Sequence, residues 1–251
     1  MFTRFLFFAF LMMSLASASA AETSSIQVLV SNGLKASMED LHRTCEASVG
    51  HPLDIRYNST AAVKKSIEAG ERFDVTMITT EAIEDLAKQG KLAGDTKMPI
   101  GRSQLGIGIK SGVPKPDIKT VEALKKALRE VKSVTYPQDG ASRGYIDNMF
   151  ERLGIAPEVK PKIILAPGSG PATQSVADGK AGFVITLFSE ILPIKGVDIL
   201  GPLPGEFASD IKFSAATSTA VSDKQAAKAV IACVTGSKAT PVLKAKGIDR
   251  K

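Results

Sequence analysis

Hydroxyl and amide side chains stand at four turns, each placed between an apolar run and the start of an amphipathic helix. The four turns are Ser31-Asn32-Gly33, Asn58-Ser59-Thr60, Gly140-Ala141-Ser142-Arg143-Gly144 and Gly168-Ser169-Gly170. The start of a helix carries free N–H groups and the positive end of the helix dipole, so it can hold an anion. The pattern therefore predicts a protein that binds a small anion rather than one that transforms it.

Each turn also has a purely structural interpretation. Ser59 or Thr60 can simply cap the following helix, a role worth about 1 kcal/mol. Gly33 can simply permit a turn conformation, and the same holds for the glycines around Ser169. Arg143 can bind a planar carboxylate through two parallel hydrogen bonds, or it can point into solvent. The recurrence of the pattern favours ligand contacts, most clearly at Ser59, Thr60 and Ser142.

The sequence offers no strong catalytic constellation. His42 and His51 do not have the spacing of a zinc pair, and no acidic cluster accompanies them. The glycines of Gly106-Ile107-Gly108 fall inside an expected strand and lack the third glycine of a dinucleotide site. Gly140-Ala141-Ser142-Arg143-Gly144 has the spacing of a Gly-x-Ser-x-Gly motif, but Ser142 has no evident histidine partner, so nucleophilic catalysis is poorly supported. We therefore expect a protein that is not an enzyme and that has no metal site and no cofactor.

The N-terminal residues have the pattern of a secretory signal peptide at 1–20. Arg4 precedes an apolar run that ends at Ala16, and Ala18-Ser19-Ala20 is a small-x-small cleavage site. An uncleaved membrane anchor is the alternative, although the apolar run is short for a membrane span. We expect a periplasmic location.

The formal net charge is +6, or 6 − 1 = +5 without Arg4. The basic residues are scattered and the chain has no Trp, so we expect no nucleic-acid partner. We expect a monomer. Cys45 and Cys233 are the two cysteines of the chain, and the sequence leaves open whether they pair or remain buried thiols.

Strand and helix patterns alternate from residue 26 to the end of the chain. Expected strands are 26–31, 53–57, 74–79, 105–110, 133–136, 163–166, 182–187, 197–201 and 212–216, and the segment around Pro99 and Gly101 is an expected loop. Helical spacing marks 34–49, 61–69, 81–89, 121–131, 146–153, 222–234 and 239–246, with a further helix starting at Pro171. This alternation is typical of an α/β protein with a mainly parallel sheet, in which ligands bind beyond the carboxyl ends of strands.

The order of these motifs resembles the periplasmic solute-binding proteins of ABC transporters, and most closely the molybdate-binding-protein family. The resemblance covers the chain after the signal peptide and rests on the Ser-Asn-Gly-Leu turn at 31–34, the Ser-Thr turn at 59–60, the segment 140–155, and Phe188-Ser189-Glu190-Ile191-Leu192-Pro193. It implies a type II periplasmic-binding-protein fold with two α/β lobes and a ligand in the cleft between them. Lobe one would be 24–103 plus 212–251, and lobe two would be 104–211.

The resemblance also implies a set of ligand contacts, which we transfer by position. The family's serine positions fall at Gly33, beside Ser31 and Asn32, at Ser59 or Thr60, at Ser142 and at Ser169. The family's tyrosine position falls near Ile185, next to Thr186, so that hydroxyl is missing here. Glu190 can line the floor of the cleft or cap a helix start in solvent, and we expect the cap.

The implied partners are a small anionic solute and a membrane permease of the ABC type. Arg143 and the missing tyrosine favour an organic carboxylate over molybdate or tungstate, and both ligand classes stay open at this point. A secreted enzyme, or an adhesin-like binding module on the same two-lobe scaffold, is the alternative function.

Overall fold

The computed structural model describes residues 24–250, so the expected signal peptide at 1–20 lies outside the described residues. Within this range the strands are β1 (Ile26–Ser31), β2 (Leu53–Asn58), β3 (Val75–Thr79), β4 (Met98–Lys110), β5 (Val134–Pro137), β6 (Ile163–Ala166), β7 (Phe183–Leu187), β8 (Val197–Pro202) and β9 (Asp210–Thr217). The α-helices are α1 (Lys35–Val49), α2 (Thr60–Glu68), α3 (Thr80–Lys88), α4 (Val121–Glu130), α5 (Arg143–Arg152), α6 (Ala156–Val159), α7 (Ser169–Ala177), α8 (Phe188–Ile191), α9 (Lys224–Thr235) and α10 (Thr240–Ala245). A short 3-10 helix, η1 (Asn32–Leu34), precedes α1.

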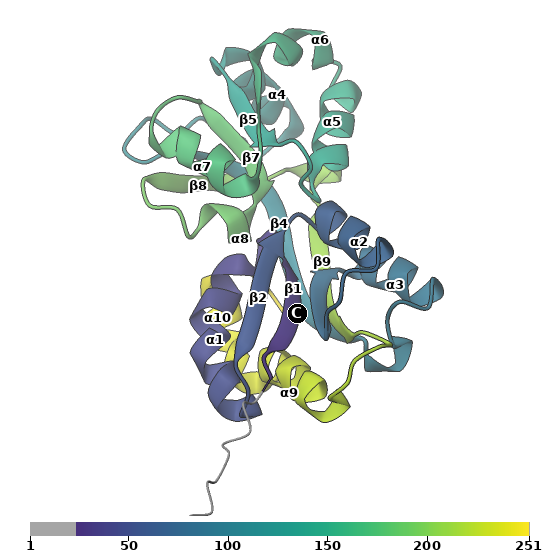
Figure 1. The fold of residues 1–251 in the computed structure, drawn as a ribbon. Helices are drawn as coiled ribbons and strands as arrows, with labels where there is room; N and C mark the ends of the chain where they lie inside the picture. The colour runs from purple at the N-terminus through teal and green to yellow at the C-terminus, as the bar shows by residue number, and fades with distance from the viewer. Residues whose placement is uncertain (1–23, 251) are drawn as a thin grey trace, which may run out of the picture.

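Strand β4 runs through both lobes of the molecule (Figure 1). It pairs antiparallel with β9 from Met98 to Gln104 and antiparallel with β7 from Leu105 to Ile109. The resulting order is β2-β1-β3-β9-β4-β7-β5-β6, with β8 paired beside β4. We keep the names lobe one and lobe two for the predicted ranges 24–103 plus 212–251 and 104–211, which meet within this strand.

Each lobe contains three parallel strands. β2, β1 and β3 pair in parallel in lobe one, and β6, β5 and β7 do so in lobe two. β4, β8 and β9 join them in antiparallel pairings. The α/β class and the two-lobe fold are confirmed. The sheet contains more antiparallel pairs than the strand–helix alternation suggested. That alternation does not reveal whether a strand at the junction of the lobes runs parallel or antiparallel to its neighbours.

Helices cover both faces of the lobe-one sheet (Figure 1). α1 and α9 pack together on one face, over a core that includes the fully buried side chains of Val28 and Val75. α2 and α3 pack against each other, over a core that includes Leu29 and Ile83. Strands buried on both sides are nearly continuous apolar runs, as expected for parallel strands with helices on both faces.

The parallel register brings the four polar turns together in pairs. Ser31 at the end of β1 pairs with Asn58 at the end of β2, so the turns that follow these strands are neighbours. In lobe two, Pro137 of β5 pairs with Ala166 of β6, and the turns at 140–144 and 168–170 follow in the same way. The carboxyl ends of parallel strands therefore place two turns in each lobe, as the fold rule predicts.

Several boundaries differ from the sequence expectation, and two of these differences have a clear local cause. The expected loop around Pro99 and Gly101 is part of β4, whose register against β9 shifts between these residues. Such a β-bulge accommodates a proline, which cannot donate to the ladder, within a strand. Helix α7 begins at Ser169 rather than at Pro171, because Gly168 stands as an extended N-cap two residues earlier than expected.

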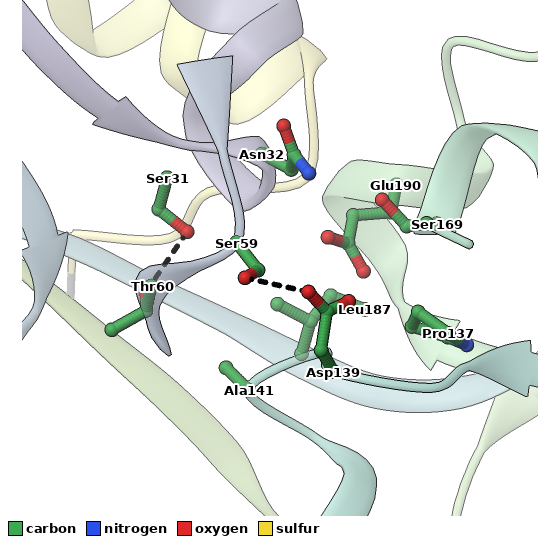
Figure 2. Close-up of a pocket in the computed structure, with 12 residues that line it drawn as sticks. Ser31, Asn32, Ser59, Thr60, Pro137, Asp139, Ala141, Ser169, Leu187 and Glu190 are labelled. Carbon is green, nitrogen blue, oxygen red and sulfur yellow. Dashed lines mark hydrogen bonds between the residues drawn. The ribbon is translucent and has the colours of Figure 1, made fainter. Parts of the chain in front are cut away.

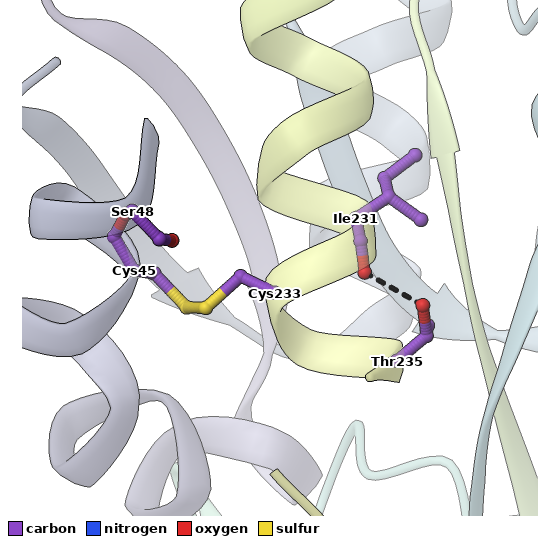
Figure 3. Close-up of a disulfide and its surroundings, with 5 residues drawn as sticks. All are labelled: Cys45, Ser48, Ile231, Cys233 and Thr235. Carbon is purple, nitrogen blue, oxygen red and sulfur yellow. Dashed lines mark hydrogen bonds between the residues drawn. A yellow bond between two sulfur atoms is a disulfide. The ribbon is translucent and has the colours of Figure 1, made fainter. Parts of the chain in front are cut away.

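A disulfide joins Cys45 of α1 to Cys233 of α9 (Figure 3). The Cα atoms are 5.6 Å apart, although the residues are separated by 188 positions in the chain. The bond therefore ties the early and late segments of lobe one together, and it settles the alternative between paired and free cysteines. Among the described residues, no helix combines the length and the apolar character needed to cross a membrane.

Candidate functional site

A polar cleft lies between the lobes where the paired turns face each other (Figure 2). Its walls come from the ends of β1, β2, β5 and β7 and from the starts of η1, α2, α7 and α8. The lining residues are Ser31, Asn32, Ser59, Thr60, Pro137, Asp139, Gly140, Ala141, Gly168, Ser169, Leu187 and Glu190. The cavity measures about 10 Å³, room for roughly one water, so a larger ligand requires the lobes to separate.

The lobe-one wall presents hydroxyl and amide groups. Thr60 Oγ1 donates a hydrogen bond to Ser31 Oγ over 3.1 Å, which leaves the Ser31 hydroxyl proton available to a ligand. Asn32 lies beside them at the start of η1 and lines the same cleft. Neutral hydrogen-bond donors of this kind can hold an anion without help from a positively charged side chain.

Ser59 has two functions in this wall. Its Oγ accepts a hydrogen bond from the Ala62 N–H over 3.1 Å and so caps α2. The same hydroxyl donates to Asp139 Oδ2 over 3.0 Å. Because Asp139 belongs to the loop after β5, this second hydrogen bond crosses from lobe one to lobe two (Figure 2).

Asp139 is a cleft residue that the sequence analysis missed. It stands directly after β5 and directly before the turn at 140–144, and its side chain reaches the lobe-one wall. A signal was present in the sequence, because a charged residue at the carboxyl end of a strand is a candidate ligand contact in an α/β fold.

Glu190 lies inside the cleft, whereas we expected it to cap a helix start in solvent; that expectation is wrong. Burial raises the pKa of the Glu190 carboxyl, and hydrogen bonds from Thr186 and Ser169 counteract only part of this effect. Thr186 Oγ1 donates to Glu190 Oε2. The raised pKa favours the protonated carboxyl, which can donate a hydrogen bond to a ligand.

The structure brings together five of the nine site residues proposed from the sequence. Those that line the cleft are Ser31, Asn32, Ser59, Thr60 and Ser169. Gly33 lies behind the wall, where a Cβ atom would come within 2.5 Å of the Phe213 ring. Thr186 is fully buried and contacts Glu190 rather than the cavity. Gly33 and Thr186 therefore support the cleft from outside it.

Arg143 does not line the cleft, contrary to the sequence expectation. Its Nε donates to Asp147 Oδ2 over 2.6 Å and its Nη1 donates to the Gln138 carbonyl over 3.1 Å. The guanidinium also lies 5.3 Å from the centre of the Tyr136 ring. The physical reason is the spacing of the ion pair, because residues four apart on a helix face each other. Arg143 is therefore held against its own lobe.

Ser142 is buried, at 1% exposure, and it too lies outside the cleft lining. Its Oγ has no hydrogen-bond partner among the described residues. It stands at the N-cap of α5 with helical backbone angles and makes no side-chain cap. The turn that carries Ser142 reaches the cleft through Gly140 and Ala141 instead.

The charge of the cleft differs from the expected anion cage. Among the described residues, no Lys or Arg lines it, whereas two carboxyl groups do, those of Asp139 and Glu190. Lys35 lines an adjoining pocket of about 370 Å³, which shares Asn32, Ser169 and Glu190 with the cleft. No group of three His, Cys, Asp or Glu side chains in the described chain could hold a metal ion.

Two α/β lobes with a polar cleft between them define a solute-binding protein of the periplasmic type. Residues 26–249 match the family model described as bacterial extracellular solute-binding protein, and the chain belongs to this family.

Two relatives and one solved structure illustrate the range of similar proteins. The chain is 26% identical over 236 residues to an aconitate isomerase from Pseudomonas sp, covering 92% of this chain and 89% of that protein. It is 25% identical over 235 residues to the molybdate-binding protein ModA of Azotobacter vinelandii, covering 92% of each. The solved periplasmic molybdate-binding protein of Azotobacter vinelandii superimposes with a TM-score of 0.76 at 19% identity, covering 90% of this chain and 100% of that one.

Proposed function

We propose that this protein binds a small organic acid in the interlobe cleft and delivers it to a membrane permease from the periplasm. The observation that carries the proposal is the composition of the cleft, which places hydroxyl and amide donors in lobe one opposite the carboxyl groups of Asp139 and Glu190 in lobe two. Membership of the solute-binding family supports the transport role.

The lobe-two carboxyls favour an organic acid over a tetrahedral oxyanion. An oxyanion such as molybdate presents acceptor oxygens in every direction, and the Asp139 carboxylate oxygens are acceptors too. An organic acid can place a carboxylate against the donors of Ser31 and Asn32, and a hydroxyl, protonated carboxyl or C–H bond against Asp139. Glu190, whose pKa is raised by burial, can donate to a further ligand oxygen.

The test is a comparison of ligand classes on the secreted form of the chain. We expect citrate and cis- and trans-aconitate to raise the unfolding temperature by an amount that grows as RT ln(1 + [L]/Kd), and calorimetry to give a one-to-one stoichiometry. Molybdate, tungstate and sulfate form the opposing panel. Submicromolar molybdate binding without any response to the organic acids would overturn the ligand class.

A matched pair of variants links binding to this cleft. Thr60→Val removes the hydroxyl that orients Ser31 and should weaken the organic acid about tenfold, as expected for the loss of one hydrogen bond. Thr219→Val removes a hydroxyl that bonds the Gly90 carbonyl elsewhere in lobe one and should leave Kd unchanged. Equal effects of the two substitutions would place the ligand outside the cleft.

A further inference from the structure

We propose that Asp139 and Glu190 act as a base and an acid that move a proton between two carbons of an unsaturated carboxylic acid bound in the cleft, so that the protein isomerises its ligand. The inference rests on the proposed organic-acid ligand and adds a reaction to it. The pairing of one accepting and one donating carboxyl group in a single small cleft carries it.

The two carboxyl groups reach the cleft from different elements of lobe two. Asp139 comes from the loop after β5, and Glu190 comes from α8 at the end of β7. Both side chains line the cavity between the lobes (Figure 2). A ligand held by the lobe-one hydroxyls would therefore face both carboxyl groups at once.

The surroundings of the two groups suit opposite roles. Asp139 is exposed toward the cleft and accepts a hydrogen bond from Ser59, so its oxygens are available as proton acceptors. Glu190 is partly buried in the cleft wall, and this burial raises the pKa of its carboxyl group, which favours the protonated form. Two titratable groups whose environments differ in this way are the usual arrangement of an acid and a base in catalysis.

A second feature beside Glu190 points to a larger ligand than the cleft alone would hold. Ser189 lines the adjoining pocket, it is 4% exposed, and its Oγ has no hydrogen-bond partner among the described residues. A buried hydroxyl without a partner costs free energy, which a ligand oxygen would recover. This pocket shares Glu190 with the cleft, and Lys35, which also lines it, offers a charge for a further ligand carboxylate.

The proposed reaction is a 1,3-proton shift that needs no oxidant or reductant. Asp139 removes a proton from the carbon next to the C=C bond, and the electron pair of that C–H bond forms the new double bond. The electrons of the old double bond take the Glu190 carboxyl proton at the far carbon. Asp139 is then protonated and Glu190 ionised, and proton exchange with water restores both groups.

The donors in lobe one would stabilise the charge that develops during this shift. Removal of the proton pushes negative charge onto the carboxylate attached to the reacting carbons, and hydroxyl and amide groups aimed at that carboxylate hold the charge. Ser31 and Asn32 are placed to do so, because they face the carboxyl groups across the cleft. One relative, similar over 92% of the length of this chain, is named aconitate isomerase, and the name denotes an isomerisation of this kind.

The test separates binding from turnover. The secreted form of the chain is incubated with cis-aconitate, and in parallel with trans-aconitate, in D2O, and proton NMR follows both the conversion of one isomer to the other and the loss of the C–H signals. Calorimetry on the same samples measures binding. We expect conversion with deuterium incorporation, and we expect Asp139→Asn and Glu190→Gln each to slow it by about 100-fold or more while binding persists.

Asp178→Asn is the matched control, because Asp178 is an exposed carboxylate at the far end of α7, and it should convert the acid at the wild-type rate. Binding of the acids with neither conversion nor deuterium incorporation by the wild type would overturn the reaction and leave the proposed binding function standing. Absence of binding would overturn the proposed function itself. Full activity of both cleft variants, each with a wild-type unfolding temperature, would overturn the assignment of Asp139 and Glu190.

Discussion

Ser59 Oγ lies 3.0 Å from Asp139 Oδ2, although the two residues are 80 positions apart and belong to different lobes. The same Ser59 oxygen accepts the Ala62 N–H at the start of α2. One side chain therefore combines a helix cap with a contact across the cleft. A ligand that separates these two residues must replace the hydrogen bond between them, which couples binding to the relative position of the lobes.

Replacing Ser59 should affect both stability and binding. In Ser59→Ala we expect a loss of about 1 kcal/mol of unfolding free energy, because the cap of α2 disappears. We also expect ligand affinity to fall about tenfold, because a donor in the cleft is lost. Urea unfolding and calorimetry measure the two effects on the same sample.

A second cap in the chain separates these effects. Thr120 caps α4 by accepting the Ala123 N–H over 3.1 Å, and it lies away from the cleft. Thr120→Ala should lose a similar amount of stability and keep the wild-type Kd. If Thr120→Ala weakened the ligand as much as Ser59→Ala does, the loss would reflect general destabilisation rather than a contact.

Arg143→Ala should leave ligand affinity within about twofold of wild type, because the guanidinium is held by Asp147 and lies outside the cleft. The expected cost is small, of the order of 0.5 kcal/mol in stability, since the ion pair is partly exposed. Calorimetry with the best organic acid of the panel measures the first quantity and urea unfolding the second. A tenfold or greater loss of affinity in a stably folded variant would return Arg143 to the binding site.

The sequence predicted the scaffold well because its signals are local. Apolar runs, helical spacing and turn residues place the polar turns at the carboxyl ends of strands, and the register of β1 with β2 joins Ser31 to Asn58. The antiparallel strands at the junction of the lobes escaped prediction, because pairing direction depends on the path of the whole chain. The disulfide stayed one of two alternatives for the same reason, since only folding brings Cys45 near Cys233.

The site was predicted less completely because side-chain direction is a tertiary property. Arg143 stands at the start of a helix as expected, but the carboxylate four residues later holds it away from the cleft. That Arg–Asp spacing was readable from the sequence and argues for an intrahelical pair. The placement of Glu190 in the cleft was not readable, because the fold of α8 against β7 determines whether its carboxyl group faces water or the lobe interior.

The disulfide should contribute strongly to the stability of lobe one. Replacing both Cys45 and Cys233 with alanine removes a link across 188 positions, and closing so long a loop is worth up to about 5 kcal/mol in the chain-entropy description. Urea unfolding of the oxidised wild type against the double variant measures this difference. Reductant should shift the wild-type curve toward that of the variant and leave the variant unchanged; identical curves for all samples would show that the bond is not formed in the secreted protein.

The raised pKa of Glu190 predicts a pH-dependent stability difference between the wild type and Glu190→Gln. Between the ordinary pKa of 4.5 and the raised folded-state pKa, the native protein binds more protons at this residue than the unfolded chain does. The contribution of Glu190 to stability therefore falls as pH rises through that window and stays low above it.

Glutamine does not titrate, so the unfolding temperature of Glu190→Gln should rise relative to that of the wild type as the pH rises from about 4 to 8. Asp139 in the cleft, and Lys35 and Glu39 beside the adjoining pocket, are present in both proteins, so the comparison isolates the change at residue 190. Thermal unfolding across this pH series measures the gain, and a difference that stays constant or shrinks with rising pH would show that the folded-state pKa of Glu190 is not raised.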